Sequence, residues 1–432
     1  MIYFDHLVET SSRKSLCSLQ IEKLHSMLQK INGSNRFYTK KFDAAGVGTK
    51  DIRTIQDLPL LPLTTKAELV QAQKDVLPFG TNTTFPESAY SRFHQTSGTT
   101  GTPLRVLDTP ESWDWWGRCW GHVLAGAGLT ENDRLFVPFS FGPFIGFWAA
   151  VEGARQIKTL MIPGGGRDSL QRLSLMKELG ATAMCCTPTY ALRLAEAAEE
   201  ADFDMGGITL QKLILAGEPG ANVPATKARI EAAWQAKCYD HAGASEVGAH
   251  SFECESQPGG THIIESEFIV EVLNPETLEA VPAGERGELI ITNLGRIGYP
   301  VIRYRSGDLV RLNQEPCACG RTFARFEGGV LGRADDMVVV RGINIFPSAV
   351  ENLVRRCEEV EEFRITVSTE REMGNLAIEL ELNNNSNPDK ARNTVEQAVR
   401  NDLSLRPEIT IVPYGTLPRF EMKAKRFHVK NI

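Results

Sequence analysis

Residues Arg92–Val106 read RFHQTSGTTGTPLRV, and their centre, Thr96–Thr102, consists only of hydroxyl residues and glycine. Glycine has no Cβ, so the backbone can approach a polyanion closely. Hydroxyl groups and backbone N–H groups can then bind phosphate oxygens. The stretch is not a Walker A loop, because no G-x4-G-K-[ST] pattern occurs in the chain. Taken alone, it fits a Ser/Gly-rich surface linker better than a phosphate loop. Its surroundings must decide between the two.

The size and charge of the chain limit the classes of function. With 432 residues it is too long for one compact core, which predicts two or three domains. The formal net charge is −7, and no run of lysine or arginine occurs. Binding to nucleic acid or to an anionic membrane surface therefore has no electrostatic support.

Localisation and redox state follow from simple patterns. No uninterrupted apolar stretch approaches the length of a membrane span. Residues 1–6, MIYFDH, lack the basic start of a signal peptide. We therefore expect a cytoplasmic protein. The nine cysteines, an odd number, argue against a disulfide scaffold.

The spacing of apolar residues predicts one helix near the start of the chain, and a helix-start pattern predicts another after the glycine-rich stretch. Ile21, Leu24, Leu28 and Ile31 recur at helical intervals before Asn32-Gly33, a plausible helix end. After the glycine-rich stretch, Thr109-Pro110-Glu111 has the form of a helix start. Trp113, Trp116 and Trp120 then share one helix face, which we interpret as core packing.

Strands and helices alternate through the next hundred residues. Strands are expected at 134–138, 158–162, 181–186, 212–216 and 236–240. Helices are expected at 144–153, 169–179, 189–199 and 223–234. This rhythm predicts an α/β fold with a mainly parallel sheet covered by helices on both faces. In such sheets ligands bind beyond the carboxyl ends of the strands.

The pattern of expected strands and helices changes twice before the end of the chain. From about residue 261, expected strands at 262–264, 268–273 and 287–292 predict an antiparallel or barrel-like, β-rich subdomain. Beyond it, a small mobile α+β unit is expected, with a helix face at Val350, Leu353, Val354 and Cys357 and strands at 362–368 and 375–382. We place the boundary at residue 332, giving domains 1–331 and 332–432.

Six motifs in this order resemble the adenylate-forming superfamily, most closely phenylacetate–CoA ligases and related aryl–CoA ligases. They are TSGTTGTP from Thr96, AGEP from Ala216, SEVG from Ser245, YPVIRYRSGDL from Tyr299, GRADDMVVVRGINIFP from Gly332 and LPRFEMKAKR from Leu417. The resemblance covers almost the whole chain. It implies that a carboxylic acid reacts with ATP to give an acyl-adenylate and pyrophosphate, and that the acyl group passes to the thiol of CoA.

The resemblance assigns nucleotide-binding roles to specific residues. It makes Ser97, Gly98, Thr99, Thr100, Gly101 and Thr102 the site for the β- and γ-phosphates. Glu246 would hold Mg²⁺, since this hard cation prefers carboxylate and phosphate oxygens. Asp308 would accept hydrogen bonds from both ribose hydroxyls. The adenosine side would be lined by Glu218, Pro219, Asp240, His241 and Ser245, with Arg333 touching the nucleotide in one state. Without the family context, Glu246 and Asp308 fit a capping or solvated glutamate and a turn aspartate.

Lys423 is the candidate catalytic residue with Glu246. In the family a lysine near the C-terminus bridges the acyl carboxylate and the α-phosphate, where one fixed cation stabilises the developing charge. Lys425 and Arg426 are nearby alternatives, and outside that context a basic tail is usually just solvated. Two positions depart from the family pattern, Phe420 for a serine and Met422 for a glycine. Asp335 would be the hinge about which the C-terminal domain rotates between the two half-reactions.

The acid pocket is expected to be apolar and aromatic. The resemblance places Phe139, Phe141 and Phe144 beside the acid, with Trp148 close by and Ala216, Gly217, Ala242 and Gly243 as further lining. An apolar slot of this kind suits a planar aryl acid. Family members often carry an aromatic residue where this chain has Ala242. Either His241 compensates for the missing ring, or the acyl pocket is larger.

Cys254, His262, Cys317 and Cys319 form a candidate metal site. Three thiolates and one imidazole are a standard tetrahedral zinc set, although C-x-C is tighter than the usual C-x2-C. From spacing alone, reduced unpaired thiols fit equally well. Some subfamilies of these ligases carry the same arrangement, and this favours a structural Zn²⁺.

Rival functions remain open at this point. The adenylate could pass to a carrier protein or to an amine instead of CoA, or the chain could be a non-catalytic nucleotide-binding protein. A serine hydrolase is excluded because no G-x-S-x-G elbow occurs. The acid could be phenylacetate-, benzoate- or aminobenzoate-like, and a homodimer is possible.

Overall fold

The computed structural model describes residues 2–96, 102–146, 148–340, 343–370, 373–383, 386–420 and 424–431. Its α-helices are α1 (His6–Glu9), α2 (Arg13–Ile31), α3 (Arg36–Ala45), α4 (Lys66–Asp75), α5 (Pro110–Gly126), α6 (Trp148–Gln156), α7 (Ser169–Glu178), α8 (Pro188–Glu200), α9 (Pro224–Trp234), α10 (Pro347–Arg355) and α11 (Pro388–Leu403). Short 3-10 helices span Thr49–Asp51, Ile55–Leu60 and Glu87–Ala89. Among these residues, no helix combines the length and apolar character needed to cross a membrane.

One large sheet organises the first three quarters of the chain. Its strands are β3 (Arg134–Val137), β4 (Leu160–Pro163), β5 (Ala183–Cys186), β6 (Lys212–Leu215), β7 (Lys237–Ala244), β8 (Gly248–Phe252), β9 (Gly260–Ile263), β10 (Phe268–Leu273), β11 (Arg286–Asn293), β12 (Tyr304–Asn313), β13 (Arg325–Glu327) and β14 (Gly332–Arg333). Their order is β10-β11-β12-β13-β9-β8-β7-β6-β5-β3-β4, and β14 pairs with β12. The predicted α/β class is confirmed.

The parallel half of the sheet has a core on each face. Successive side chains of a strand point to opposite faces. Leu135 and Val137 therefore pack in the cluster beneath α5 and α6, whereas Phe136 between them packs against α7, α8 and α9. The near-continuous apolar sequence of these strands follows from burial on both sides.

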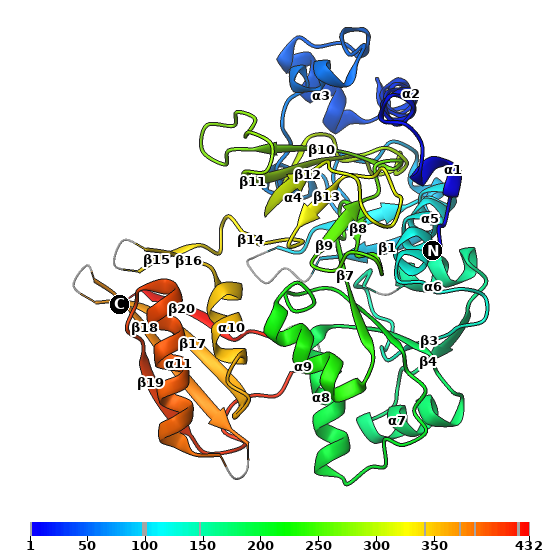
Figure 1. Cartoon of the computed structure of the whole chain (residues 1–432). Helices are drawn as coiled ribbons and strands as arrows, with labels where there is room; N and C mark the ends of the chain where they lie inside the picture. The colour runs from blue at the N-terminus through cyan, green and yellow to red at the C-terminus, as the bar shows by residue number, and fades with distance from the viewer. Residues whose placement is uncertain are drawn as a thin grey trace.

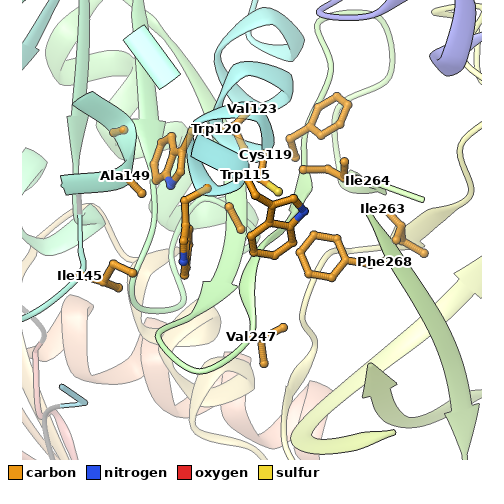
Figure 2. Packing of buried hydrophobic residues seen from close by; sticks show 14 of the residues in the cluster. Trp115, Cys119, Trp120, Val123, Ile145, Ala149, Val247, Ile263, Ile264 and Phe268 are labelled. Carbon is orange, nitrogen blue, oxygen red and sulfur yellow. The ribbon is translucent and has the colours of Figure 1, made fainter. Parts of the chain in front are cut away.

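The tryptophan-rich helix α5 belongs to the first of these cores. Trp113, Trp116 and Trp120 are buried, as predicted, and so is Trp115. The indole of Trp115 lies 5.3 Å from the ring of Phe268, centroid to centroid, and Figure 2 shows it among residues of the antiparallel strands. Helix α5 thus joins the two halves of the sheet through one hydrophobic cluster.

The antiparallel strands are not a separate sheet. β7 pairs parallel with β6 but antiparallel with β8, so the β-rich part expected as a subdomain continues the parallel part without a break. The expected strand at 236–240 extends further, to Ala244, and the extra residues His241–Ala244 make the pairing with β8. This extension places the SEVG motif at a sheet turn.

A second, smaller unit follows. Its four strands are β17 (Val360–Glu370), β18 (Met373–Leu382), β19 (Glu408–Val412) and β20 (Phe427–Asn431), in the order β19-β18-β17-β20. Two short strands, β15 (Val338–Val340) and β16 (Ile343–Ile345), precede it. α10 and α11 contribute to its hydrophobic core, in which Val350, Leu353 and Val354 are buried as expected. Figure 1 shows this unit as a separate lobe in orange and red, with α10 beside α9 of the large lobe.

Candidate functional site

The predicted phosphate loop is closed at its base by a hairpin. β1 (Arg92–Gln95) and β2 (Arg105–Asp108) pair antiparallel. Beyond them, Thr96 N–H donates to Leu104 O at 2.9 Å, and Leu104 N–H donates to Thr96 Oγ1 at 3.0 Å. Thr102 is exposed. The predicted phosphate ligands Ser97, Gly98, Thr99, Thr100 and Gly101 lie outside the described residues.

Two further elements fix the position of this hairpin. Gln73 on α4 donates to Pro103 O at 3.0 Å and accepts from Arg105 N–H at 2.7 Å. Gln95 N–H donates to Pro143 O at 2.8 Å, within the segment expected to bind the acid. The hairpin therefore links α4 to the candidate acid pocket.

Glu246 lies in the turn between β7 and β8 and is buried. Tyr304 donates its hydroxyl to Glu246 Oε1 at 2.7 Å, and Lys66 Nζ lies 3.3 Å from the same oxygen. Burial raises the pKa of Glu246, but Lys66 and Tyr304 outweigh burial, so the pKa lies below the ordinary value. The side chain is therefore a carboxylate at neutral pH.

An ion pair joins the turn of Glu246 to the hairpin of the phosphate loop. Arg296 Nε and Nη2 donate to the two carboxylate oxygens of Asp108, each at 2.6 Å, and both side chains are fully buried. Arg296 Nη1 also donates to Ser245 O at 2.6 Å. Because Asp108 ends β2 and Ser245 precedes Glu246, this pair fixes the carboxylate relative to the hairpin.

Asp308 lies on β12, directly opposite Arg333 of β14. Arg333 Nη1 lies 3.2 Å from Asp308 Oδ1, and the same guanidinium makes two bonds to Asp335, at 2.9 and 3.0 Å. The pKa of Asp308 is raised to about 6, chiefly by burial; the carboxylates of Glu246 and Asp335 add to the shift and Arg333 opposes it. Tyr304, which bonds to Glu246, lies on the same strand as Asp308, so β12 connects these two predicted site carboxylates.

Several other predicted nucleotide ligands share the carboxyl edge of the parallel strands. Leu215 of β6 lies opposite Asp240 of β7, so the loop Ala216–Pro219 and His241 emerge side by side. Gly217 and Pro219 are exposed. The pKa of Asp240 is raised to about 7 by burial and by Glu253. This edge is where α/β sheets bind ligands.

His241 is packed. Its ring is buried, lies 4.5 Å from the Trp120 ring, and makes a 2.8 Å hydrogen bond from Nδ1 to Ser251 O. Burial lowers its pKa to about 4, so the ring is neutral. Ala242 is half-buried and Gly243 is exposed at the same strand end.

The acid segment is a loop for most of its length. The helix expected from Phe144 begins at Trp148, and that expectation was wrong because Gly142, Pro143 and Gly146 keep the preceding residues irregular. Phe141 packs on Trp148 with ring centroids 4.5 Å apart. Phe139 is half-buried near Tyr190, whereas Phe144 is 40% exposed. The expected aromatic cluster is thus only partly assembled.

The four candidate zinc ligands meet in one buried cluster. The ligand atoms of Cys254, His262, Cys317 and Cys319 all lie within 4.8 Å of one another. Cys254 Sγ lies 3.7 Å from Cys317 Sγ, and a tetrahedral site with Zn–S bonds of about 2.3 Å needs a separation of about 3.8 Å. His262 Nδ1 bonds to Phe323 O at 2.9 Å, and its Nε2 lies 3.3 Å from Cys319 Sγ. The donor set fits zinc.

Lys423 lies outside the described residues, but its successors contact the large lobe. Ala424 N–H donates to Glu218 Oε2 at 2.7 Å. Arg426 Nη1 donates to Thr189 Oγ1 at 3.2 Å. The segment expected to carry the catalytic lysine therefore reaches the predicted adenosine loop.

Three site contacts were missed by sequence reasoning. Lys66 and Tyr304 contact Glu246, and Arg296 pairs with Asp108. Two of these residues carry a local sequence signal: Tyr304 lies in the motif YPVIRYRSGDL, and Lys66 follows two threonines at a helix start. Arg296 and Asp108 are 188 residues apart and carry no local signal.

Two family profiles match the chain. The AMP-binding enzyme profile matches residues 59–295, and the profile of the AMP-binding enzyme C-terminal domain matches residues 342–430. Phenylacetate-coenzyme A ligase of Escherichia coli is 31% identical over 98% of this chain and 97% of its own length. The protein of the same name from Thermus thermophilus is 29% identical over 98% of this chain and 97% of its own length.

A solved structure gives a second kind of comparison. 2-Hydroxyisobutyryl-CoA ligase in its postadenylation state with 2-HIB-AMP matches with a TM-score of 0.93, at 28% identity over 98% of this chain and 92% of that one. The same ligase with 2-HIB-AMP and CoA in the thioesterification state matches with a TM-score of 0.74, at equal identity and coverage. The lobes of this chain are thus arranged as in the first state.

Proposed function

Because this chain belongs to the AMP-binding enzyme family of adenylate-forming ligases, we propose that it is an ATP-dependent acid–CoA ligase acting on an aromatic carboxylic acid. The acid and ATP give an acyl-adenylate and pyrophosphate, and the acyl group then passes to the CoA thiol with release of AMP. The observation that carries this proposal is that β12 contains Asp308 and, through Tyr304, binds Glu246, whose turn is joined to the phosphate-loop hairpin by Arg296 and Asp108. Full-length similarity to phenylacetate-coenzyme A ligases supports the CoA acceptor.

The nucleotide is held by groups on three elements. Residues 97–102 bind the β- and γ-phosphates, and Asp308 accepts both ribose hydroxyls. Glu246, kept ionised by Lys66 and Tyr304, is the carboxylate ligand for Mg²⁺. When bound, the metal neutralises charge on the triphosphate. Lys66 adds a second cation at the same place, which favours departure of pyrophosphate.

The acid lies at the carboxyl edge of the parallel strands. Phe139 and Phe141 supply an apolar lining, and Ala242 with Gly243 leaves the adjacent wall open. The engagement of the His241 ring with Trp120 and Ser251 favours the larger pocket over a compensating histidine. A small branched hydroxy acid is the second candidate class, since the solved relative binds 2-HIB-AMP.

The two half-reactions use two arrangements of the lobes. In the present arrangement Lys423 activates the acid, and rotation about Asp335 then admits CoA. The unequal TM-scores to the two states of the solved relative support this division. We also propose a domain boundary at residue 332, a cytoplasmic location and a homodimer.

The cysteine–histidine cluster is structural. Zinc held by Cys254, His262, Cys317 and Cys319 would cross-link two turns far from each other in sequence. Glu9 pairs with the buried Arg321 beside the cluster, and Tyr3 donates to Cys319 O at 2.7 Å. A metal bound there would support the packing of the N-terminal segment.

The decisive experiment is an acid-dependent pyrophosphate-release screen of phenylacetate, benzoates, aminobenzoates and 2-hydroxyisobutyrate, followed by CoA addition to the best acid. We expect release with an aryl acid and a CoA thioester as product. Release without CoA dependence would favour a carrier-protein or amine acceptor. Absence of release with every acid would favour a non-catalytic nucleotide-binding protein. Lys423→Ala should abolish adenylation and spare thiol transfer from a supplied adenylate.

A further inference from the structure

The carboxylate of Glu218 connects the two lobes. Its Oε1 accepts from Thr189 N–H at 2.8 Å, in the first turn of α8, and its Oε2 accepts from Ala424 N–H at 2.7 Å. Thr189 Oγ1 in turn accepts from Arg426 Nη1 at 3.2 Å. We call these three hydrogen bonds the Glu218 bridge. Those that cross between the lobes join segments 206 residues or more apart in the chain.

On the small-lobe side the bridge is made by Ala424 and Arg426, which are held firmly within that lobe. Arg426 makes two bonds to Glu362, at 2.6 and 2.9 Å, and its side chain is 10% exposed. Directly after Arg426, β20 pairs parallel with β17, beginning at Phe427 opposite Ile365. Ala424 and Arg426 therefore move with the small lobe as a body.

The bridge also lies where both the nucleotide and the lysine are expected. Glu218 is in the AGEP motif, after β6, and Ala424 directly follows Lys423 in the sequence. We propose that Glu218 is a positioning residue that holds the segment after Lys423 against the large lobe and so stabilises the adenylation arrangement. This inference rests on the proposed function, and it goes beyond an adenosine-lining role for Glu218.

The physical argument is one of differential stability. A contact made in only one of two conformations shifts the population toward that conformation. Rotation of the small lobe would carry Ala424 and Arg426 away from Glu218 and Thr189, which stay with the large lobe. Hydrogen bonds to a carboxylate are among the stronger ones, because a charged group takes part. The bridge must break before CoA can react.

Glu218→Gln tests this role with little change in shape. A glutamine has one accepting oxygen and one NH₂ group, so it cannot accept from both Thr189 N–H and Ala424 N–H. We expect the adenylation rate at saturating ATP to fall by about 10-fold to 100-fold, the range for one hydrogen bond to a charged group. Thioester formation from a supplied acyl-adenylate should be unchanged, and saturating ATP separates the rate effect from any change in adenosine binding. Loss of ATP affinity alone, or equal loss in both half-reactions, would overturn the proposal.

Two further variants separate the bridge from interdomain contacts in general. Thr189→Val removes the hydroxyl that accepts from Arg426 and should reproduce the selective loss of adenylation more weakly. Tyr414→Phe is the matched control, since it removes an exposed bond to Glu200, 3.2 Å long, between the same lobes. It should leave both half-reactions unchanged. An equal effect of Tyr414→Phe would mean that Glu218 has no special position.

A measurement without substrates keeps the two proposals distinguishable. In the ligand-free protein, amide hydrogen exchange of the peptide 424–431 should be faster in Glu218→Gln than in wild type, with exchange of α7 unchanged. If no acid releases pyrophosphate from the wild type, the proposed function fails while this result still tests the bridge. Unchanged exchange in 424–431 would overturn the bridge itself.

Discussion

Lys66 lies beside the carboxylate of Glu246, where the proposed function also places the phosphates of ATP. Its Nζ is 3.3 Å from Glu246 Oε1, while its side chain is 49% exposed. It is the first residue of α4, whose start is fixed by a capping box between Thr65 and Glu68. A cation at this helix start can contact phosphate oxygens and at the same time keep Glu246 ionised.

Replacement of Lys66 with methionine keeps the apolar stem and removes the charge. We expect adenylation to slow by roughly 1.5–3 kcal/mol of barrier, the value of a charge-assisted hydrogen bond. The pKa of Glu246 should rise, because Lys66 lowers it in the wild type, and with this competing cation removed less Mg²⁺ should be needed for half-maximal pyrophosphate release. Lys74→Met, at an exposed position on the same helix, is the matched control. An unchanged Mg²⁺ dependence in Lys66→Met would contradict the role of this lysine.

Asp308 gives the site a pH dependence. Its pKa is raised to about 6, mainly by burial, so acidification neutralises it near that pH. In the proposed function it is the ionised form that accepts hydrogen bonds from both ribose hydroxyls. We therefore expect kcat/KM for ATP to fall as the pH drops through about 6.

Asp308→Asn separates this effect from titration of ATP itself. Phosphate groups also titrate near pH 6, but that contribution is common to both proteins. The variant should have a lower kcat/KM at neutral pH and a flatter profile below it. An identical acid limb in wild type and variant would assign the pH dependence to the substrate.

At the scale of elements, the pair Arg296–Asp108 holds the β1–β2 hairpin to the Ser245–Glu246 turn. Both side chains are fully buried, and Arg296 also lies over the rings of Trp116 and Tyr299. Removal of one partner leaves an uncompensated buried charge, which costs about 3–5 kcal/mol. Arg296→Met should lower the free energy of unfolding by that amount, as measured by urea denaturation.

A double variant distinguishes the charge effect from loss of packing. Asp108→Leu combined with Arg296→Met removes both charges, and its stability should exceed that of Arg296→Met alone. Its adenylation rate should be low, because the bonds from Arg296 that join the hairpin to the Ser245–Glu246 turn are then lost. Full activity in the double variant would show that the ion pair does not position the site.

The elements were predicted from sequence far better than the contacts between them. The βαβ rhythm from Arg134 to Asp240 follows directly from alternating apolar patterns, and each expected strand and helix is present. The helix expected at Phe144 starts four residues later, since the Gly142-Pro143 pair breaks the apolar pattern there. The extension of β7 through Ala244, which merges two expected sheets, depends on pairing with β8 and has no local signal.

The same limit applies to the site. Glu246 and Asp308 could be named because motifs mark them, and Cys254, His262, Cys317 and Cys319 because their side chains are typical metal ligands. The partners that tune them were not predictable. Tyr304 is 58 residues from Glu246, and Glu218 is 206 residues from Ala424. Such pairs depend on the assembled fold, and spacing along the chain carries no information about them.

At the scale of the whole molecule, the two lobes meet through polar contacts. Arg229 on α9 bonds to Glu361 at 3.1 Å and to Val360 O, and Tyr414 bonds to Glu200. Ionic and hydrogen-bonded interfaces of this kind can separate and re-form, because water replaces the lost partners. The interface therefore suits an enzyme whose lobes must change arrangement once in each cycle.

Asp335 is the residue at which that change is predicted to occur. Arg333 and Ala334 are still attached to the large lobe, through pairing with Asp308 and a 2.7 Å bond from Ala334 N–H to Gly307 O. The Asp335 side chain is 65% exposed. A proline at position 335 fixes the φ angle of that residue near about −65° and restricts Ala334 to extended conformations. The backbone at the hinge can then no longer change its dihedral angles freely, so rotation of the small lobe is restricted.

We expect Asp335→Pro to retain acid-dependent pyrophosphate release while CoA thioester formation falls by at least about tenfold, since trapping one arrangement by about 1.4 kcal/mol is enough for that factor. Asp335→Ala is the control: it removes the bonds to Arg333 but leaves the backbone free, so both half-reactions should continue. Both rates are measured separately, with ATP and acid or with supplied acyl-adenylate and CoA. Equal loss of the two rates in Asp335→Pro, or the same split in Asp335→Ala, would move the hinge elsewhere, because a backbone restriction at the pivot should slow thioester formation and spare adenylation.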